Sequence, residues 1–206
     1  MLDNLLGIAD DVALAREEER LTKLRAVELF DDNLLKQWAP GTFGTLAAIH
    51  HQLFQDIYAF AGQMRTEDIS KGNFRFASVM YLPAALDSID EMPQKTFAEI
   101  VAKYVEMNIA HPFREGNGRS TRIWLDHIMS SSLGKAIDWT QISKEDYLLA
   151  MERSPVKDIE IKSLLQAALS EQALERASFM KGIDASYKYE GYAAYTAEGL
   201  SGNGGL

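Results

Sequence analysis

The 206-residue sequence contains no cysteine and no long apolar run. Without cysteine the chain cannot form disulfides or thiolate metal sites, and nothing indicates an oxidising compartment. No stretch approaches the roughly 18 consecutive apolar residues that span a bilayer. The N-terminus, MLDNLLGIADD, also lacks the basic region and apolar run of a secretory signal. We therefore expect a cytoplasmic protein with no membrane partner.

An excess of positive charge is missing too. The formal net charge is -9, which argues against a general nucleic-acid binder, because such proteins contact phosphates mainly through Lys and Arg. Hydrophobic residues make up 47% of the chain, enough for one sizeable core at this length. We expect a single domain that does not bind nucleic acid directly.

Helical periodicity dominates what is present. In the segment 11–30, DVALAREEERLTKLRAVELF, apolar residues recur at three- and four-residue steps. After a break at Trp38–Gly41, Thr42 is suited to cap a second helix that runs to Gly62. Further helices are predicted at 83–92, 95–110, 119–131, 143–153, 156–170 and from about 173 to 192.

One region has strand character. ISKGNFRFASVMYL, at 69–82, places a Gly-Asn pair between short aromatic and β-branched runs, which predicts a small hairpin. The expected fold is therefore mostly α-helical, a single-domain helical bundle with a small β-hairpin. His50, His51 and His127 lie in helical patterns without metal-ligand spacing, so we expect core or surface roles for them.

The stretch AHPFREGNGRSTR, at 110–122, gathers residues of several chemical types. Pro112 disfavours helical geometry at the preceding residue, so His111 is predicted at a helix end. Glycines at the start of the next helix let backbone N–H groups approach an anion, which the helix dipole also favours. Arg119 and Arg122, three residues apart, would reach the same anion.

A carboxylate and a histidine complete this stretch. Glu115 is the kind of ligand that Mg²⁺ requires, because that ion is usually held by one or two carboxylates plus substrate phosphates. His111 is the residue suited to accept a proton near neutral pH. The GxxxxGK[ST] loop and the protein-kinase motifs are absent. The residues indicate group transfer on a nucleotide by another route.

The stretch also matches HPFx[DE]GNGRxxR, the signature of the Fic family, which the chain resembles from about Gly41 to Tyr192. Fic proteins mostly transfer AMP from ATP to a hydroxyl side chain of a target protein. The resemblance implies a role for each signature residue: His111 as the base, Glu115 as the Mg²⁺ ligand, Gly116 and Gly118 as the anion hole, and Asn117, Arg119 and Arg122 as ligands of the α-, β- and γ-phosphates.

The predicted hairpin resembles the flap of the same family. In these proteins the flap aligns a segment of the target by strand-like main-chain pairing. The corresponding residues are Ser70, Lys71, Gly72, Asn73, Phe74, Arg75 and Phe76.

A second motif lies near the C-terminus, in SYKYEGY. Ser186 and Glu190 are four residues apart on one helix face, and Gly191 suits a helix end. This resembles the inhibitory motif [ST]xxxE[GN] of the third, self-contained Fic class. The resemblance implies that Glu190 pairs with Arg122 and blocks the productive γ-phosphate position. It also implies that self-AMPylation of Tyr187 would displace the helix.

The resemblance divides the domain into an N-terminal helical extension (1–40), a catalytic core (41–172), an inhibitory helix (173–192) and a flexible tail (193–206). The implied partners are ATP and a target protein, with a type II topoisomerase subunit as one candidate, and a homo-oligomer would stabilise the inhibited form. Several alternatives stay open. They are transfer of another nucleotide or phosphate moiety, a nucleotide-binding regulator or toxin component, and a bifunctional enzyme that also removes AMP, with direction set by the metal ion.

Overall fold

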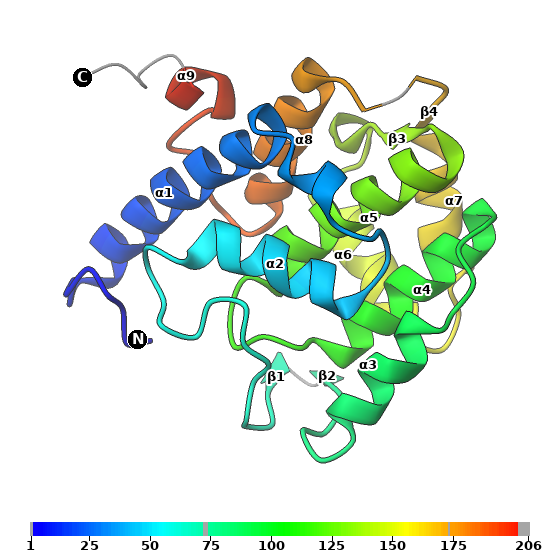
Figure 1. Ribbon diagram of the computed structural model, residues 1–206, viewed down its shortest axis with the longest axis horizontal. Coiled ribbons are helices and arrows are strands. Elements are labelled where there is room, and N and C mark those ends of the chain that lie inside the picture. The colour runs from blue at the N-terminus through cyan, green and yellow to red at the C-terminus, as the bar shows by residue number, and fades with distance from the viewer. Residues whose placement is uncertain (1, 72–73, 173, 202–206) are drawn as a thin grey trace.

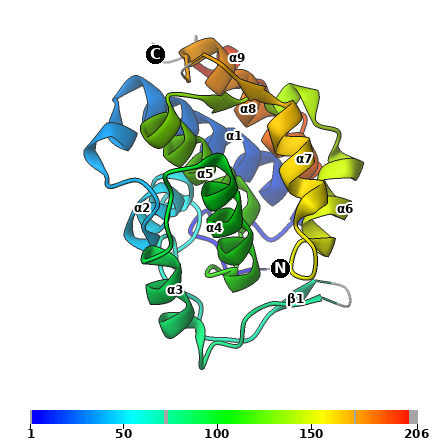
Figure 2. The same cartoon turned by 90° about the vertical axis from the view of Figure 1, so that its right-hand side faces the viewer.

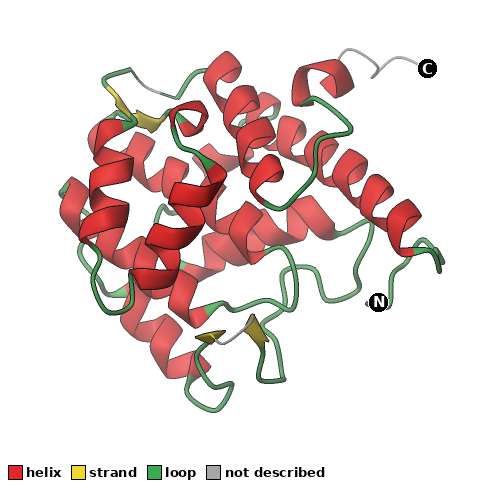
Figure 3. Ribbon diagram, turned by 180° about the vertical axis from the view of Figure 1, so that it is seen from behind, coloured by secondary structure: helices red, strands yellow, loops and turns green. Residues whose placement is uncertain are grey.

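The computed structural model describes residues 2–71, 74–172 and 174–201, and these are mostly helical (Figures 1 and 3). Gly72 and Asn73 of the predicted flap lie outside the described residues. The helices are α1 (Asp11–Asp31), α2 (Phe43–Phe54), α3 (Leu82–Asp90), α4 (Phe97–Ala110), α5 (Asn117–Leu133), α6 (Lys144–Arg153), α7 (Ile159–Ala167), α8 (Arg176–Tyr189) and α9 (Ala197–Ser201), with short 3₁₀ turns η1 (Leu34–Gln37) and η2 (Trp139–Gln141). Within the described ranges, each helix is too short or too polar to cross a membrane.

Two small antiparallel sheets accompany the helices. The predicted hairpin is present as β1 (Ser70–Lys71) and β2 (Phe74–Arg75), in which Ser70 is opposite Arg75. The second sheet pairs β3 (Ala136–Ile137) with β4 (Leu169–Ser170) and was not predicted. The expectation of a single strand region was therefore wrong. Strands of two residues are too short to show the alternating pattern by which a strand is recognised in a sequence. The prediction of a mostly helical fold with a small hairpin is confirmed.

Local capping chemistry sets where several helices begin. The side chains of Asp10, Thr42 and Ser143 accept hydrogen bonds from backbone N–H groups in the first turns of α1, α2 and α6. Thr96 and Glu99 form a reciprocal capping box at the start of α4. The helix that leads to the signature stretch therefore has a well-defined beginning.

Helix α5 lies among α2, α4 and α8, and most of its residues are buried (Figures 1 and 2). Trp124, Leu125 and Ile128 have no exposed surface. The same helix also buries Arg119 and Arg122 near its N-terminus. Burying a charged group is costly unless it is paired, so each guanidinium needs an internal partner.

Helix α2 is shorter than predicted, because it ends at Phe54 rather than at Gly62. The following residues form consecutive turns, in which Ile57 and Tyr58 N–H groups both donate to the Phe54 carbonyl. Ile57 and Tyr58 are buried in these turns. Buried apolar residues therefore continue past the end of α2 at a similar spacing, and this is why the predicted helix was too long.

The segment assigned to a flexible tail is partly structured, which corrects that expectation for residues 193–201. The backbone N–H groups of Ala194 and Tyr195 donate to the Glu19 carboxylate at 3.0 and 3.1 Å. Helix α9 follows and packs beside α1, with Ala197 buried (Figure 1). A buried carboxylate on a distant helix orders this backbone, and no local composition reveals that.

A buried ion network joins α1 to α8. Lys23 Nζ, on a side chain that is 1% exposed, lies 3.0 Å from Glu19 Oε1 and 3.1 Å from Asp184 Oδ1. It also donates to the Tyr195 carbonyl at 2.6 Å. The first helix is therefore bound to the helix that contains the predicted inhibitory residues.

This network predicts an effect on stability. Lys23→Met leaves the buried Glu19 carboxylate without its cation, so it should lower the free energy of unfolding by about 3 kcal/mol. Arg153→Met is the matched control, because it removes an exposed pair with Glu160 and should cost less than about 1 kcal/mol. Urea unfolding at neutral pH measures both variants. Equal losses would contradict the structural role given to Lys23.

Candidate active site

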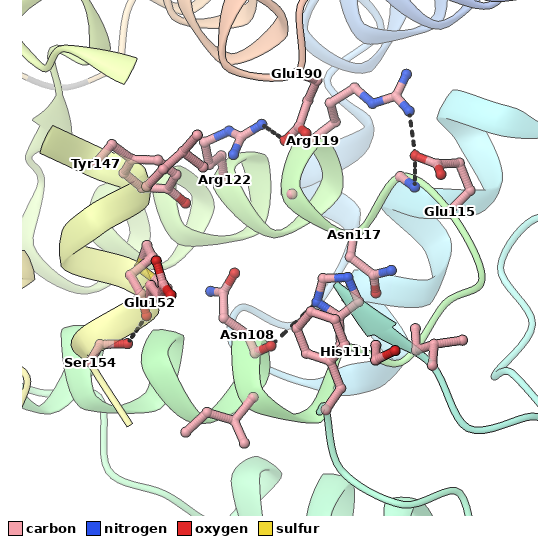
Figure 4. Close-up of a pocket in the computed structure, with 18 of the residues that line it drawn as sticks. Asn108, His111, Glu115, Asn117, Arg119, Arg122, Tyr147, Glu152, Ser154 and Glu190 are labelled. Atoms are coloured by element: carbon pink, nitrogen blue, oxygen red, sulfur yellow. Dashed lines mark hydrogen bonds and ion pairs between the residues drawn. The ribbon is translucent and has the colours of Figure 1, made fainter. Parts of the chain in front are cut away.

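A cavity of about 730 Å³ brings the predicted site residues together (Figure 4). It lies where the end of α4 and the start of α5 face the flap, α6 and the end of α8. Its wall includes signature residues His111, Glu115, Gly116, Asn117, Gly118, Arg119 and Arg122, flap residues Ser70 and Phe76, and Glu190. Residues from three separate parts of the sequence therefore share one pocket.

His111 is held at the end of α4 in a left-handed conformation, with φ of 48°. The ring stacks on Phe76 of the flap, with centroids 3.6 Å apart. Its Nδ1 atom lies 3.3 Å from the Asn108 carbonyl oxygen. A carbonyl can only accept, so this contact assigns the proton to Nδ1 and makes Nε2 the basic nitrogen. In this tautomer Nε2 is the nitrogen that can accept a proton.

Arg65 holds the backbone around this histidine and was not singled out from the sequence. Its guanidinium, on a residue 1% exposed, donates to the carbonyls of His111 at 2.8 Å, Glu67 at 2.7 Å and Ala110 at 3.2 Å. It also donates to the carbonyl of Ala77, at the base of the flap. Because these acceptors are backbone atoms, no side-chain motif marks the interaction.

His50 supports the signature loop from α2. Its Nδ1 accepts from the Gly62 N–H at 2.9 Å, so Nε2 carries the proton and donates to the Glu115 carbonyl at 2.8 Å. Its ring stacks on Phe113 with centroids 3.8 Å apart. His50 is a core residue, as expected, and it also fixes the backbone of the signature loop at Glu115.

Asn117 closes the loop upon itself. Its amide oxygen accepts from the Phe113 N–H at 2.9 Å, and its amide nitrogen donates to the Phe113 carbonyl at 2.7 Å. The contact with the α-phosphate that the resemblance implies stays a prediction. The structure gives the side chain a bracing role, with one amide hydrogen left beyond this pair of bonds.

Two glycines are needed because neighbouring side chains come close. Gly116 has φ of 75°, and a Cβ atom there would lie 2.2 Å from Phe54 Cζ. A Cβ atom at Gly118 would lie 2.5 Å from Glu190 Oε1. Gly118 follows directly after the first residue of α5, where the backbone N–H groups have no intrahelical acceptors. The first N–H groups of α5 are of the kind that an anion site uses, although the Gly116 N–H donates to Glu115 Oε1 at 2.9 Å.

Arg122 is enclosed by the end of α8 (Figure 4). Its Nε donates to Ser186 Oγ at 2.6 Å, and its Nη2 donates to the Ser186 carbonyl at 3.0 Å and to Glu190 Oε1 at 2.9 Å. The rings of Tyr147 and Tyr189 lie on the guanidinium, 5.4 and 5.3 Å from its centre. Helix α8 then ends before Gly191, whose φ is 95°.

Arg119 has a different counter-ion, and that residue was also missed from the sequence. Its Nη2 lies 2.7 Å from Glu18 Oε1 of α1 and 3.1 Å from Glu115 Oε1. Burial alone raises the pKa of Glu18, but the Arg119 charge and hydrogen bonds from Tyr58, Arg119 and Tyr192 outweigh it and leave the pKa below its ordinary value. Glu18 is therefore ionised at neutral pH.

Tyr187, on α8, lies in the core and packs against α1. Its side chain has no exposed surface, and its ring is 5.2 Å from Lys23 Nζ and 5.5 Å from the Arg119 guanidinium centre. Self-AMPylation of Tyr187 stays a prediction. It would require this buried hydroxyl to become accessible.

The opposite wall of the pocket comes from α6 and the turn after it. The lining residues there, which no motif marked, are Tyr147, Leu148, Met151, Glu152, Ser154 and Pro155, with Asn108 and Ile109 from α4 beside them. The apolar members of this set provide a surface for a planar group. Helix periodicity predicted α6, but it could not show that α6 faces the signature loop.

The chain is similar in sequence to proteins of known family. Residues 41–129 match the Fic/DOC family. A probable protein adenylyltransferase Fic of Salmonella typhimurium is 31% identical over 183 residues, covering 83% of this chain and 88% of that protein. The protein adenylyltransferase VbhT of Bartonella schoenbuchensis is 29% identical over 89% of this chain, which spans only 39% of that larger protein.

Solved structures agree in fold. The BepC protein of Bartonella tribocorum, a VirB-translocated effector determined with bound AMPPNP, superposes with a TM-score of 0.70 at 21% identity. The aligned region covers 84% of this chain and 93% of that one. An N-terminal Fic domain from Bartonella quintana with bound ADP gives 0.71 at 21% identity, over 84% and 92% of the two chains.

The environment of His50 predicts a pH-dependent stability. Burial, the largest cause, lowers its pKa from 6.5 to about 4, partly offset by the Glu115 carbonyl. As the pH falls below about 6.5, His50 binds a proton in the unfolded chain but not in the folded chain. The free energy of unfolding therefore decreases between about pH 6.5 and pH 4. The loss amounts to about 3 kcal/mol at most.

Urea unfolding of wild type and His50→Gln at several pH values measures this loss. Glutamine retains a donor and an acceptor but does not titrate, so its curve should be flatter between pH 6.5 and 4. His51→Gln, on the exposed neighbour, should keep the wild-type slope. Parallel curves for wild type and His50→Gln would contradict the assignment.

Proposed function

Because the chain belongs to the Fic/DOC family, we propose that it is a protein adenylyltransferase that transfers AMP from ATP to a hydroxyl side chain of a target protein. The observation that supports this most directly is the shared pocket. An oriented base, the N-terminus of α5 and a half-exposed carboxylate line one cavity that also borders the flap. Each of these groups has a place in transfer of a nucleotidyl group.

The reaction begins at His111. Its Nε2 accepts the proton of a Tyr, Ser or Thr hydroxyl, and the oxygen forms a bond to the α-phosphorus of ATP. The bond from that phosphorus to the bridging oxygen breaks, and pyrophosphate leaves in line with the attack. The Phe76 ring and the Asn108 carbonyl keep the imidazole aligned for this step. The hydroxyl proton therefore ends on the histidine.

The phosphates lie at the start of α5, where backbone N–H groups and the helix dipole favour negative charge. The Glu115 side chain is 44% exposed and borders the cavity, so one carboxylate and the phosphate oxygens together would hold Mg²⁺. The part of the chain that the structure describes contains no group of three or more His, Cys, Asp or Glu side chains that could hold a metal alone. Bound Mg²⁺ would neutralise charge on the departing pyrophosphate.

The adenine lies toward α6 in this arrangement. Leu148 and Met151 supply apolar surface, and Glu152 and Asn108 supply polar groups near it. The flap then presents the target, because an extended segment can pair with an exposed strand beside the base. Ser70 and Phe76 connect this strand pair to the pocket wall. A type II topoisomerase subunit is one candidate target with suitable hydroxyl groups.

The end of α8 restrains the reaction in this proposal. Ser186 and Glu190 use Nε and Nη2 of Arg122, the atoms that would otherwise bind a γ-phosphate. A nucleotide that cannot place its γ-phosphate loses the in-line geometry at the α-phosphorus, which slows transfer. The resulting brake is intramolecular, since α8 belongs to the same chain.

One observation favours removal of AMP as a second activity. Glu190 lines the cavity, with its side chain 24% exposed, so its carboxylate can orient water as well as engage Arg122. In that reaction the water oxygen attacks the phosphorus and the target hydroxyl leaves. Release of AMP from a modified target by wild type, and its loss in Glu190→Gly, would support this activity.

The general base gives the first test of transfer. His111→Ala should lower the rate of AMP transfer by about 10²- to 10⁴-fold, because no other group takes the proton. Intact-mass analysis after incubation with MgATP and an acceptor protein measures the AMP-sized gain. His51→Ala is the matched control, since His51 is an exposed histidine that does not line the cavity. Undiminished transfer by His111→Ala would overturn the mechanism.

The brake gives the second test. Glu190→Gly should raise the transfer rate on the order of 10²-fold, because the γ-phosphate can then reach Arg122. Glu190→Gln, which keeps the size but loses the charge, should give an intermediate rate. The same mass measurement compares these variants with wild type. An unchanged rate in Glu190→Gly would remove the inhibitory role and leave the transfer reaction itself standing.

A further inference from the structure

We infer that Glu18, on α1, is a positioning residue whose charge keeps Glu115 available for Mg²⁺ by neutralising Arg119. The inference rests on the proposed function, because it concerns the metal that Glu115 would hold. It adds a residue that lies outside the signature, 97 positions before Glu115. Glu18 acts on the metal site through the arginine between them.

The contacts form a chain of three charged groups. Arg119 Nη2 bridges Glu18 Oε1 at 2.7 Å and Glu115 Oε1 at 3.1 Å. Glu115 Oε1 also accepts from the Gly116 N–H at 2.9 Å. One nitrogen atom therefore contacts both carboxylates, and the strength of its hold on Glu115 depends on Glu18.

Burial makes the arrangement electrostatically sensitive. The side chains of Glu18 and Arg119 are 4% and 1% exposed, whereas Glu115 is 44% exposed and faces the cavity. Glu18 is fixed by the hydroxyl of Tyr192, which donates to Oε1 at 2.9 Å, and by that of Tyr58, which donates to Oε2. The inner pair is therefore rigid, and the outer carboxylate is the one that can meet a ligand.

The charges explain what Glu18 does. Two carboxylates and one guanidinium leave the cluster with a net charge of about -1, which attracts a divalent cation. Without the Glu18 charge the cluster is neutral, and the buried guanidinium has Glu115 as its main counter-ion. Glu115 would then be drawn toward Arg119 and would bind Mg²⁺ less well. The N-terminal helix thus contributes to metal affinity without contacting the metal.

The packing of Arg119 keeps its guanidinium beside Glu18. The rings of Phe54, Tyr187 and Tyr192 lie 4.8, 5.5 and 4.9 Å from its guanidinium centre and enclose it. Loss of the Nη2 contact would leave Glu18 as a buried unpaired charge, which is strongly unfavourable, whereas Nε and Nη1 of the same guanidinium have no hydrogen-bond partner among the described residues. Arg119 therefore acts as a fixed cation between the two carboxylates.

Metal-dependent ADP binding tests the inference without any turnover. Isothermal calorimetry gives the ADP dissociation constant in EDTA and in saturating Mg²⁺. The constant in EDTA divided by the constant in Mg²⁺ is the ratio that reports the metal contribution. Glu18→Gln should lower this ratio roughly fivefold to tenfold, as expected for one unit charge at moderate distance in a partly buried site. Its ADP affinity in EDTA should not fall.

Glu19→Gln is the matched control. Glu19 is the neighbouring buried carboxylate on α1, but it pairs with Lys23 and the backbone near Tyr195 rather than with Arg119. A purely structural role for α1 would lower the ratio in both variants. The inference requires a drop in Glu18→Gln and none in Glu19→Gln, and equal ratios in the two variants would overturn it.

If Glu18→Gln folds poorly because it leaves Arg119 without its main counter-ion, a comparison of Arg119→Gln with the double variant Glu18→Gln/Arg119→Gln keeps the inference testable, since the double variant removes both members of the buried pair. Arg119→Gln alone removes the cation and should raise the ratio, while the double variant returns the net charge to about -1 and should restore the wild-type ratio. A double variant with the same ratio as Arg119→Gln would overturn the inference. A wild-type ratio of about one would instead overturn it together with the metal part of the proposed function.

Discussion

Two buried arginines at the start of α5 are the constraint on which the site depends. They lie three residues apart inside the domain, and each is neutralised by a carboxylate from a distant part of the chain: Glu18 of α1 for Arg119, and Glu190 of α8 for Arg122. Buried charges require partners, so these two helices must pack where they do. The N- and C-terminal segments are consequently part of the site's charge balance.

The two pairs differ in how permanent they are. Glu18 is almost fully buried, and two tyrosine hydroxyls donate to its carboxylate, so its position is fixed. Glu190 is partly exposed and sits on the last turn of a helix that borders the cavity. A ligand phosphate can therefore compete with Glu190 for its arginine, whereas Glu18 stays in place. The Glu18–Arg119 pair is therefore the more permanent of the two.

The sequence predicted what local patterns encode. Helical periodicity located α1 and α4–α8, and the signature located the pocket through residues such as His111 and Glu115. Long-range partners were missed because they have no spacing rule: Arg65 bonds backbone carbonyls, His50 meets the loop through a carbonyl 65 residues away, and Glu18 pairs across the fold. The end of α2 and the second sheet were predicted wrongly for a related reason. Tertiary packing, rather than a local sequence pattern, determines both.

The crowding at Gly118 links the signature loop to α8. Any side chain there would collide with Glu190 and Arg122, because a Cβ atom would lie 2.5 Å from Glu190 Oε1 and 3.0 Å from Arg122 Nη1. The same residue also lines the cavity. A larger side chain at position 118 would have to displace the ends of the Glu190 and Arg122 side chains, which together tie α8 to α5. The packing of the C-terminal helix and the shape of the loop are therefore coupled through one backbone position.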